Sequence, residues 1–224
     1  MAGYYASMAH IDLQISRLRQ ALFEFGVLDD TVLCFTSDHG EMLGQYNLWR
    51  KGFPYEGSAR IPLILNGPGI SARTEDRIIE MRDIIPTLLE AVGVSIPEEV
   101  EGRSFLQARD QGNLGSLTWR DALHGEHFLF GQSLQWIRWD DYKYIWFSKD
   151  GTEQMFNLAE DSQEQNNLVY APRAEAALDT GRSWLIKYLS GREEGFVKNG
   201  KLVPGAQATC LLKTSHKLPD GLNY

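Results

Sequence analysis

Cysteine is scarce in this chain: only Cys34 and Cys210 occur among 224 residues. Two cysteines are too few for a disulfide scaffold or a zinc ribbon, so folds held by such links are excluded. Cys34 stands inside an apolar run, and we interpret it as a small buried hydrophobic side chain.

Basic charge and long apolar runs are also lacking. Lys and Arg number 22 against 30 for Asp and Glu, which gives a net charge of −8. That balance repels polyphosphate, and we expect no nucleic-acid partner. The apolar runs at residues 32–35 and 61–65 are far shorter than the roughly 20 residues that span a bilayer, so we expect no membrane partner. The first residues carry no signal peptide, which predicts a cytoplasmic chain as it stands, or a periplasmic or secreted one if a signal lies upstream.

The remaining composition is that of a soluble globular protein. Apolar residues make up 43% of the chain and charged residues 23%. The length suits one sizeable domain or a domain with a small subdomain.

The first part of the chain alternates predicted helices and strands. Apolar residues spaced three and four apart predict an amphipathic helix over residues 8–25, ended by Gly26. The continuous apolar run at residues 31–36 is typical of a parallel strand covered on both faces. A second short strand is expected at residues 61–65, and a helix at residues 83–93 with Asp83 as its N-cap.

The second part has a different texture. We interpret residues 111–116 as a linker, and place the domain boundary between residues 1–112 and 113–224. Short strand-like runs follow and predict an antiparallel meander: residues 133–139, 141–147 and 153–157. A final helix is expected over residues 172–189.

Asp38, His39 and Gly40 end the first predicted strand. Open parallel sheets bind ligands beyond the carboxyl ends of their strands. An Asp oxygen and a neutral His nitrogen are adjacent ligands for a divalent metal, and glycine permits a close backbone approach. The competing interpretation is an Asp that caps the next turn beside a solvated His.

Further candidates lie in the aromatic loop at residues 41–58, which is long enough to be functional. The ammonium of Lys51 can neutralise a substrate oxyanion or assist a leaving group, although most single lysines are surface residues. Glu41 and Glu56 could join a metal, and a helix start or a salt bridge explains them equally well. His124 and His127 are candidate ligands or substrate contacts in a polar stretch that is more often plain surface.

Several segments in one order resemble the sulfatases of the alkaline phosphatase superfamily. In the catalytic region these are residues 4–12, 36–44, 51, 55–62, 83–89 and 102–105. Residues 143–146 and 154–161 are similar to the C-terminal subdomain of the arylsulfatase-like branch. The resemblance reaches to about Leu189 and corresponds to the C-terminal half of such an enzyme.

The resemblance implies a fold class and a site. The fold is α/β, with part of an alkaline-phosphatase-like parallel sheet flanked by helices and then a small subdomain of antiparallel strands and a helix. Asp38 and His39 match the late pair of ligands of a catalytic divalent cation, usually calcium, with manganese and magnesium as alternatives. Lys51 matches the lysine that contacts sulfate. The subdomain would form one wall of the substrate pocket, and His127 is a candidate substrate contact there whose role no family motif fixes.

The departures from the family pattern concern the nucleophile. Sulfatases attack with a formylglycine made in a C-x-P-S-R or related motif, and neither Cys34 nor Cys210 lies in one. Ser95 begins a similar run but lacks the arginine. The early acidic metal ligands and the upstream basic residue of the family are absent too.

We therefore expect a sulfatase-family hydrolase of sulfate esters, represented by a portion that is inactive by itself. Its substrate is a small sulfate ester or a sulfated glycan. One alternative is a phosphonate or phosphate ester hydrolase of the same superfamily, and another is a non-catalytic remnant that binds an anion or a partner. An incomplete sheet exposes an edge and apolar faces, which predicts self-association.

Overall fold

A computed structural model describes residues 1–106, 119–129 and 131–205. The predicted linker at residues 111–116 and Cys210 lie outside these ranges. None of the described helices is long and apolar enough to cross a membrane. Contacts group the chain into two compact units: the first holds Met1–His39, Leu43–Trp49 and Ile61–Thr118, and the second holds Gly40–Met42, Arg50–Arg60 and Trp119–Tyr224.

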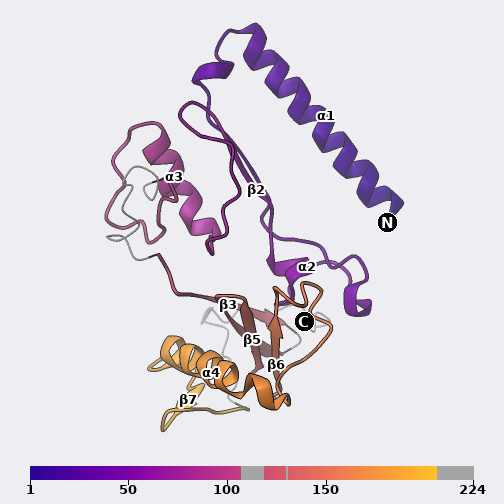
Figure 1. The fold of residues 1–224 in the computed structure, drawn as a ribbon, viewed down its shortest axis with the longest axis vertical. Helices are drawn as coiled ribbons and strands as arrows, with labels where there is room; N and C mark the ends of the chain where they lie inside the picture. Colours follow the sequence, from indigo (N-terminus) through magenta and orange to yellow (C-terminus); the bar gives the residue numbers. More distant parts are fainter. Residues whose placement is uncertain (107–118, 130, 206–224) are drawn as a thin grey trace, which may run out of the picture. The chain divides into compact units, whose positions relative to one another are not determined.

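The first unit begins with α1 (Ala2–Glu24), the amphipathic helix that the spacing predicts. It starts earlier than expected and ends before Gly26, whose φ of +69° favours glycine. None of its residues is buried, so the apolar stripe of α1 lies exposed in the described part of the chain. Figure 1 shows this long helix at the N-terminus.

Two short strands follow in the first unit. β1 (Leu33–Thr36) pairs with β2 (Leu63–Asn66), and Cys34 lies opposite Leu65. The pair is antiparallel, so the parallel direction predicted from the run at residues 31–36 is wrong for these strands. A continuous apolar run reports that both faces of a strand meet apolar groups, and it does not determine the direction of the neighbouring strand.

The predicted helix at residues 83–93 is α3 (Ile84–Ala91). The Asp83 carboxylate does not cap it; instead it accepts hydrogen bonds from the amides of Glu80 (2.9 Å) and Arg103 (2.8 Å). A Cβ on Gly102 would lie 1.9 Å from the Arg82 carbonyl oxygen, so this approach requires glycine. Asp83 thus joins the start of α3 to the segment after it. The described part of the unit also contains the short 3₁₀ turns η1 (Leu28–Asp30), η2 (Gln45–Asn47) and η3 (Met81–Asp83).

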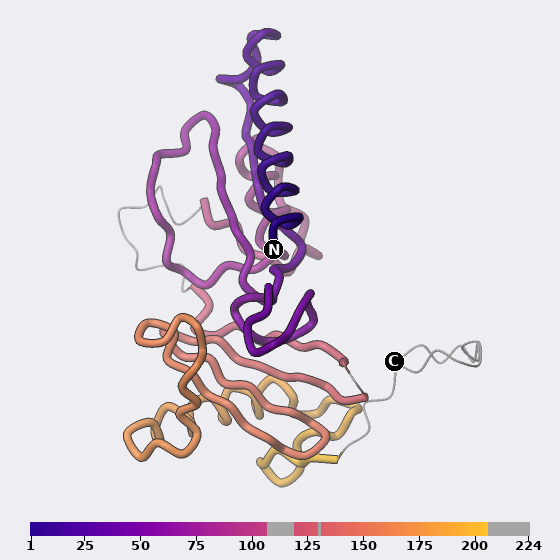
Figure 2. Tube along the Cα trace, turned by 90° about the vertical axis from the view of Figure 1, so that its right-hand side faces the viewer, coloured from indigo at the N-terminus to yellow at the C-terminus, as the bar shows by residue number. Residues whose placement is uncertain are grey.

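The second unit is built on a four-stranded antiparallel meander, of which the sequence predicted three strands (Figures 1 and 2). Its strands are β3 (Ala122–Leu129), β4 (Gln132–Trp139), β5 (Tyr142–Phe147) and β6 (Glu153–Asn157). The sequence did not indicate β3, because this edge strand carries polar residues and Gly125 where apolar alternation would mark a strand. The other elements are α2 (Glu56–Ala59), η5 (Pro172–Ala174), α4 (Glu175–Leu189), β7 (Val197–Lys198) and β8 (Lys201–Leu202).

The strand register gives the meander two faces of different character. One face packs against α4 and forms the core of the unit; we call it the helix face, and its buried side chains are those of Ile137, Tyr144, Trp146 and Met155. Gly181 lets α4 come close, since a Cβ there would lie 2.8 Å from the Cβ of Tyr144. The opposite face contacts Arg50–Arg60; we call it the loop face, and its side chains include those of His127, Lys143, Gln154 and Phe156.

Candidate active site

The predicted metal ligands lie directly after β1 in a tight turn. The Nε2 atom of His39 is 3.4 Å from Oδ2 of Asp38, and the His39 amide donates to Oδ1 of Asp38 at 2.9 Å. Ser37 Oγ donates to the His39 carbonyl oxygen at 2.7 Å, which closes the turn. The Asp38 side chain is 77% exposed and that of His39 is 38% exposed, so both can be reached from solvent.

This spacing fits a shared cation. Two ligand atoms at about 2.4 Å from one calcium ion and at right angles to each other are about 3.4 Å apart. The carboxylate oxygen and the imidazole nitrogen have this separation. Asp38 and His39 therefore can contribute two ligands to one divalent cation, and the rest of its coordination must come from other groups.

No group of three or more His, Cys, Asp or Glu side chains arranged for a metal occurs among residues 1–106, 119–129 and 131–205. Glu41 accepts a hydrogen bond from the Arg50 amide. Glu56 forms ion pairs with Lys143 and, at 3.9 Å, with Arg60. The structural alternatives that the sequence left open, a helix start and a salt bridge, thus account for Glu56, which begins α2 and pairs with Lys143. Glu41 holds the Arg50 backbone instead and is not at a helix start.

Gly40 makes the close approach that the motif predicts. Its amide donates to the Ser58 carbonyl oxygen at 2.8 Å. A Cβ on Gly40 would lie 2.1 Å from the Gly57 carbonyl oxygen, so any side chain at position 40 would clash with the backbone. Glycine at position 40 is therefore required by the packing of the chain against α2.

Lys51 and His127 come from distant parts of the sequence, and the second unit brings their neighbourhoods together. Gly52, the residue after Lys51, has a φ of +98°, and a Cβ on it would lie 3.1 Å from Nε2 of His127. The His127 ring therefore lies against the backbone beside Lys51. The side chains of Lys51 and His127 are both exposed, so solvent reaches both groups.

A buried charged cluster lies behind this contact. Lys143 is 2% exposed, and its Nζ donates to Glu164 Oε1 at 2.8 Å and to the Pro54 carbonyl oxygen at 2.9 Å. The Glu56 carboxylate pairs with the same ammonium, and the Glu56 amide donates to Glu164 Oε2 at 2.6 Å. Burial raises the pKa of Glu164, although the Lys143 ammonium opposes the rise.

Lys143 and Glu164 were not predicted from the sequence as components of this site. The available signal was a single lysine within the strand-like aromatic run at residues 142–147. A charge in the middle of a buried strand is rare unless it is paired, and it points to an ion pair. Its partner, Glu164, is 1% exposed and lies in a loop whose sequence carries no such signal.

Ser58 and Tyr55 also hold the segment Arg50–Arg60 in place on the loop face. Ser58 Oγ accepts hydrogen bonds from the amides of Gly52 (3.0 Å) and Phe53 (3.3 Å). Tyr55 packs edge to face on Phe156 and donates from its hydroxyl to Gln154 Oε1 at 2.9 Å. Burial raises the pKa of the Tyr55 phenol, so this hydroxyl stays a donor at neutral pH.

His124 lies on the helix face, away from His127. Its Nε2 is 2.7 Å from Oε1 of Gln135, and its ring stacks on Tyr188 with a centroid distance of 5.2 Å. Residues three apart on a strand point to opposite faces. We therefore assign His124 to the packing of α4 on the sheet.

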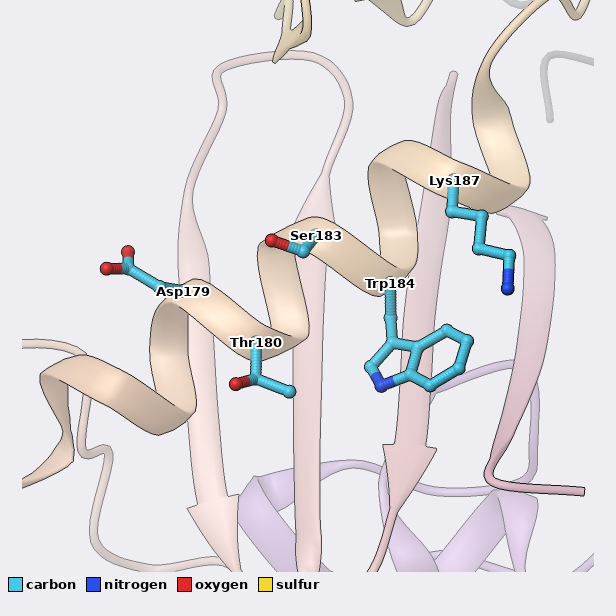
Figure 3. Close-up of a pocket in the computed structure, with 5 residues that line it drawn as sticks. All are labelled: Asp179, Thr180, Ser183, Trp184 and Lys187. Carbon is cyan, nitrogen blue, oxygen red and sulfur yellow. The ribbon is translucent and has the colours of Figure 1, made fainter.

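A shallow depression of about 410 Å³ lies on the outer surface of α4 (Figure 3). Its lining residues are Asp179, Thr180, Ser183, Trp184 and Lys187. The Lys187 ammonium lies 4.7 Å from the centre of the Trp184 ring, where a cation–π interaction accounts for both side chains. None of the residues predicted from the sequence lines it.

The described residues do not supply the family's nucleophile. Cys34 lies within β1, half-buried, and burial raises the pKa of its thiol. A thiol in such surroundings is a poor nucleophile. The sequence around Cys34 also does not fit conversion to formylglycine.

Comparisons with known proteins place these residues in a family. Residues 1–94 match the family model described as Sulfatase. An arylsulfatase of Clostridium perfringens is 43% identical over 215 residues, a match that covers 94% of this chain and 44% of the relative.

Solved structures agree with the sequence match. The structure of BT4656 in complex with its substrate D-glucosamine-2-N,6-O-disulfate has a TM-score of 0.68 at 27% identity, covering 81% of this chain and 38% of that one. A phosphonate monoester hydrolase of Agrobacterium radiobacter has a TM-score of 0.69 at 29% identity, covering 84% and 40%. The α/β fold class expected from the sequence is confirmed. The chain spans less than half the length of these relatives, and it is a member of the sulfatase family.

Proposed function

We propose that this chain contributes to the hydrolysis of sulfate esters by supplying two cation ligands, a sulfate-binding lysine and a wall of the substrate pocket. The observation that carries the proposal is the 3.4 Å separation of Asp38 Oδ2 and His39 Nε2. The match to arylsulfatases supports it.

Asp38 and His39 would hold the cation. A divalent cation supplies positive charge that stabilises the sulfate oxygens as they gain charge in the transition state. We propose calcium, with manganese and magnesium as competitors because an imidazole ligand is less usual for calcium. The turn at Ser37 keeps the carboxylate and the imidazole on the same side, so the protein orders these ligands before the cation arrives.

Lys51 and His127 would act on the substrate. The Lys51 ammonium offsets negative charge on the sulfate oxygens or on the departing alcohol oxygen. The His127 ring, which lies against Gly52, would contact the sulfate ester from the loop face. A small sulfate ester or a sulfated glycan is the proposed substrate class; the BT4656 structure holds a sulfated glucosamine.

Cation binding by the chain tests the first part of the proposal. Calcium titration with NMR detection should shift the resonances of Asp38 and His39, with weak, millimolar affinity because two side chains make an incomplete site. Asp38→Asn should weaken binding at least tenfold, whereas Asp29→Asn, an exposed change outside the site, should not. Equal shifts in both variants, or none in the wild type, would overturn the assignment.

Turnover tests the second part. The isolated chain should not hydrolyse an aryl sulfate in the presence of calcium, since it lacks the nucleophile motif. Steady turnover that survives Lys51→Ala would contradict both the missing nucleophile and the role of Lys51. Absence of calcium and sulfate binding at millimolar ligand in calorimetry would favour a non-catalytic remnant instead.

A phosphonate or phosphate ester hydrolase is the second candidate. The similarity to the Agrobacterium radiobacter phosphonate monoester hydrolase favours it, because its TM-score of 0.69 is as high as the 0.68 of the BT4656 structure. A competition titration with sulfate and methyl phosphonate separates the candidates. Tighter binding of sulfate at Lys51 supports the sulfatase.

Self-association is part of the proposal. The apolar stripe of α1 is exposed, with Leu18 at 53% and Ile11 at 43%. Apolar surface of this kind promotes association. Light scattering at micromolar concentrations should show oligomers that Ile11→Gln/Leu18→Gln reduces, and a monodisperse monomer in the wild type would refute this part.

A further inference from the structure

We propose that Lys143 and Glu164 are positioning residues that lock Arg50–Arg60 onto the loop face and thereby hold Lys51 beside His127. The inference rests on the proposed role of Lys51 and goes beyond it by assigning the device that places this residue. The residues that form the device lie far from Lys51 in the sequence.

The cluster is better suited to fixing a position than to stabilising the fold. Lys143 and Glu164 are 2% and 1% exposed, and removing two charges from water offsets most of their mutual attraction. Apolar residues would fill the same space at lower cost. The ion pair instead specifies one position for the docked segment. Lys143 binds the Pro54 carbonyl oxygen and the Glu56 carboxylate, and Glu164 accepts a hydrogen bond from the Glu56 amide.

The carboxylates of the cluster are paired where Arg50–Arg60 docks. Lys143 pairs with Glu56 and Glu164, and Arg60 pairs with Glu56 at 3.9 Å. Arg138 lies opposite Lys143 on β4, and the negative charge of Glu56 opposes the lowering of the Arg138 pKa that burial causes. A shifted segment would take Glu56 away from Lys143 and leave a buried ammonium with fewer partners.

Position passes from the cluster to Lys51 through Ser58. The cluster holds Pro54 and Glu56, and Ser58 Oγ ties the amides of Gly52 and Phe53 to the start of α2. Gly52 in turn lies against His127. Hydrogen bonds or close contacts therefore hold the chain at each step between the Lys143 ammonium and the peptide bond of Lys51.

Hydrogen exchange of the Gly52 and Phe53 amides tests the inference on the full chain. Lys143→Met/Glu164→Gln removes both charges, keeps the side-chain lengths and leaves an oxygen for the Glu56 amide, so it should fold. We expect the two amides to exchange at least tenfold faster than in the wild type. In Lys143→Arg, which keeps the positive charge and the hydrogen-bond donors, the two amides should exchange within about threefold of the wild-type rate.

The matched control is Arg182→Met, which breaks the ion pair between Arg182 and Glu153 on the helix face (2.6 Å). Exchange rates are compared at equal global stability, set by urea. Less than twofold change in the control supports the inference. An unchanged rate in the double variant, or an equal rise in the control, overturns it by showing that the cluster only supports the fold.

A sulfate titration on the same samples separates this inference from the proposed function. If sulfate shifts the Lys51 and His127 resonances in the wild type, the double variant should bind sulfate at least tenfold more weakly while Arg182→Met keeps its affinity. No shift in the wild type refutes the sulfate-binding role of Lys51, and the exchange rates still decide whether Lys143 and Glu164 position the segment.

Discussion

The helix face and the loop face of one four-stranded sheet are built in opposite ways. The helix face buries Ile137, Tyr144 and Met155 at 0% exposure against α4. The loop face holds its partner segment through the ammonium of Lys143 and through Gln154. Apolar contacts supply most of the stability of a fold and tolerate repacking, whereas charged contacts accept one arrangement. One face of the sheet therefore supplies stability, and the other fixes the position of the docked segment Arg50–Arg60.

The largest effect should come from removing only one partner of the ion pair between Lys143 and Glu164 on the loop face. Lys143→Met leaves the Glu164 carboxylate buried without its partner and should destabilise the second unit by about 3–5 kcal/mol. Lys143→Met/Glu164→Gln should recover more than half of that loss. Urea unfolding followed by tryptophan fluorescence measures both, since five of the six tryptophans lie in this unit. If the double variant were less stable than Lys143→Met, the ion pair would not behave as a coupled charged contact, and the proposed difference between the two faces would be refuted.

The helix face should respond to lost volume rather than to lost charge. Leu185 is fully buried on α4, and Leu185→Ala should cost about 3 kcal/mol through the transfer and cavity terms. Ser183→Ala, on the exposed side of the same helix, should stay within about 0.5 kcal/mol. The Gly52 and Phe53 amides should keep their relative protection in Leu185→Ala; selective loss there would show that the two faces are coupled.

A smaller effect is expected at the contact between Gly52 and His127. Gly52→Ala forces a side chain to adopt a φ of +98° and brings its Cβ to 3.1 Å from the imidazole, which should cost about 2 kcal/mol. The control is Gly195→Ala, which has a positive φ of +69° but nothing within 4 Å. A His127 ring shift in Gly52→Ala and none in the control confirms the contact.

The smallest effects are those of pH, and they should have opposite signs on the two faces. Burial raises the pKa of Glu153, but the hydrogen bonds from Arg182 and Tyr144 outweigh it and lower the net pKa. Glu153 therefore stabilises the fold above its ordinary pKa, and this contribution is lost as the pH falls. The raised pKa of Glu164 has the reverse consequence: its contribution is greatest in acid and is lost as the pH rises through the raised value.

Urea unfolding between pH 3 and pH 7 distinguishes the two carboxylates. Relative to the wild type, Glu153→Gln should weaken the loss of stability in acid, and Glu164→Gln should weaken the loss as the pH rises. Slopes of the same sign in both variants would contradict the assignment of the two environments.

The elements that the sequence predicted are those with a periodic apolar signal. The spacing in α1 and α4 and the alternation in β4 to β6 depend on local burial, so these elements could be read from the residues. β3 escaped because an edge strand with His124, Gly125 and Glu126 lacks that alternation. The direction of β1 against β2 was not predicted because it depends on a partner 27 to 33 residues away in the sequence.

The candidate site was predictable where function resides in neighbouring residues. Asp38 and His39 are adjacent in the sequence, and the structure places their ligand atoms 3.4 Å apart. The contact between Gly52 and His127 depends on the docking of Arg50–Arg60 on the sheet, which no local pattern encodes. The roles of Asp38, His39, Lys51 and His127 stay predictions until the titrations described above are done.

The two hydrogen bonds that Ser58 accepts have a mechanical consequence. By joining the amides of Gly52 and Phe53 to a residue six and five positions further on, they tie the two ends of residues 52–58 together. Because Lys51 is joined to Gly52 by a peptide bond, any displacement of this closed stretch would also displace the backbone of Lys51.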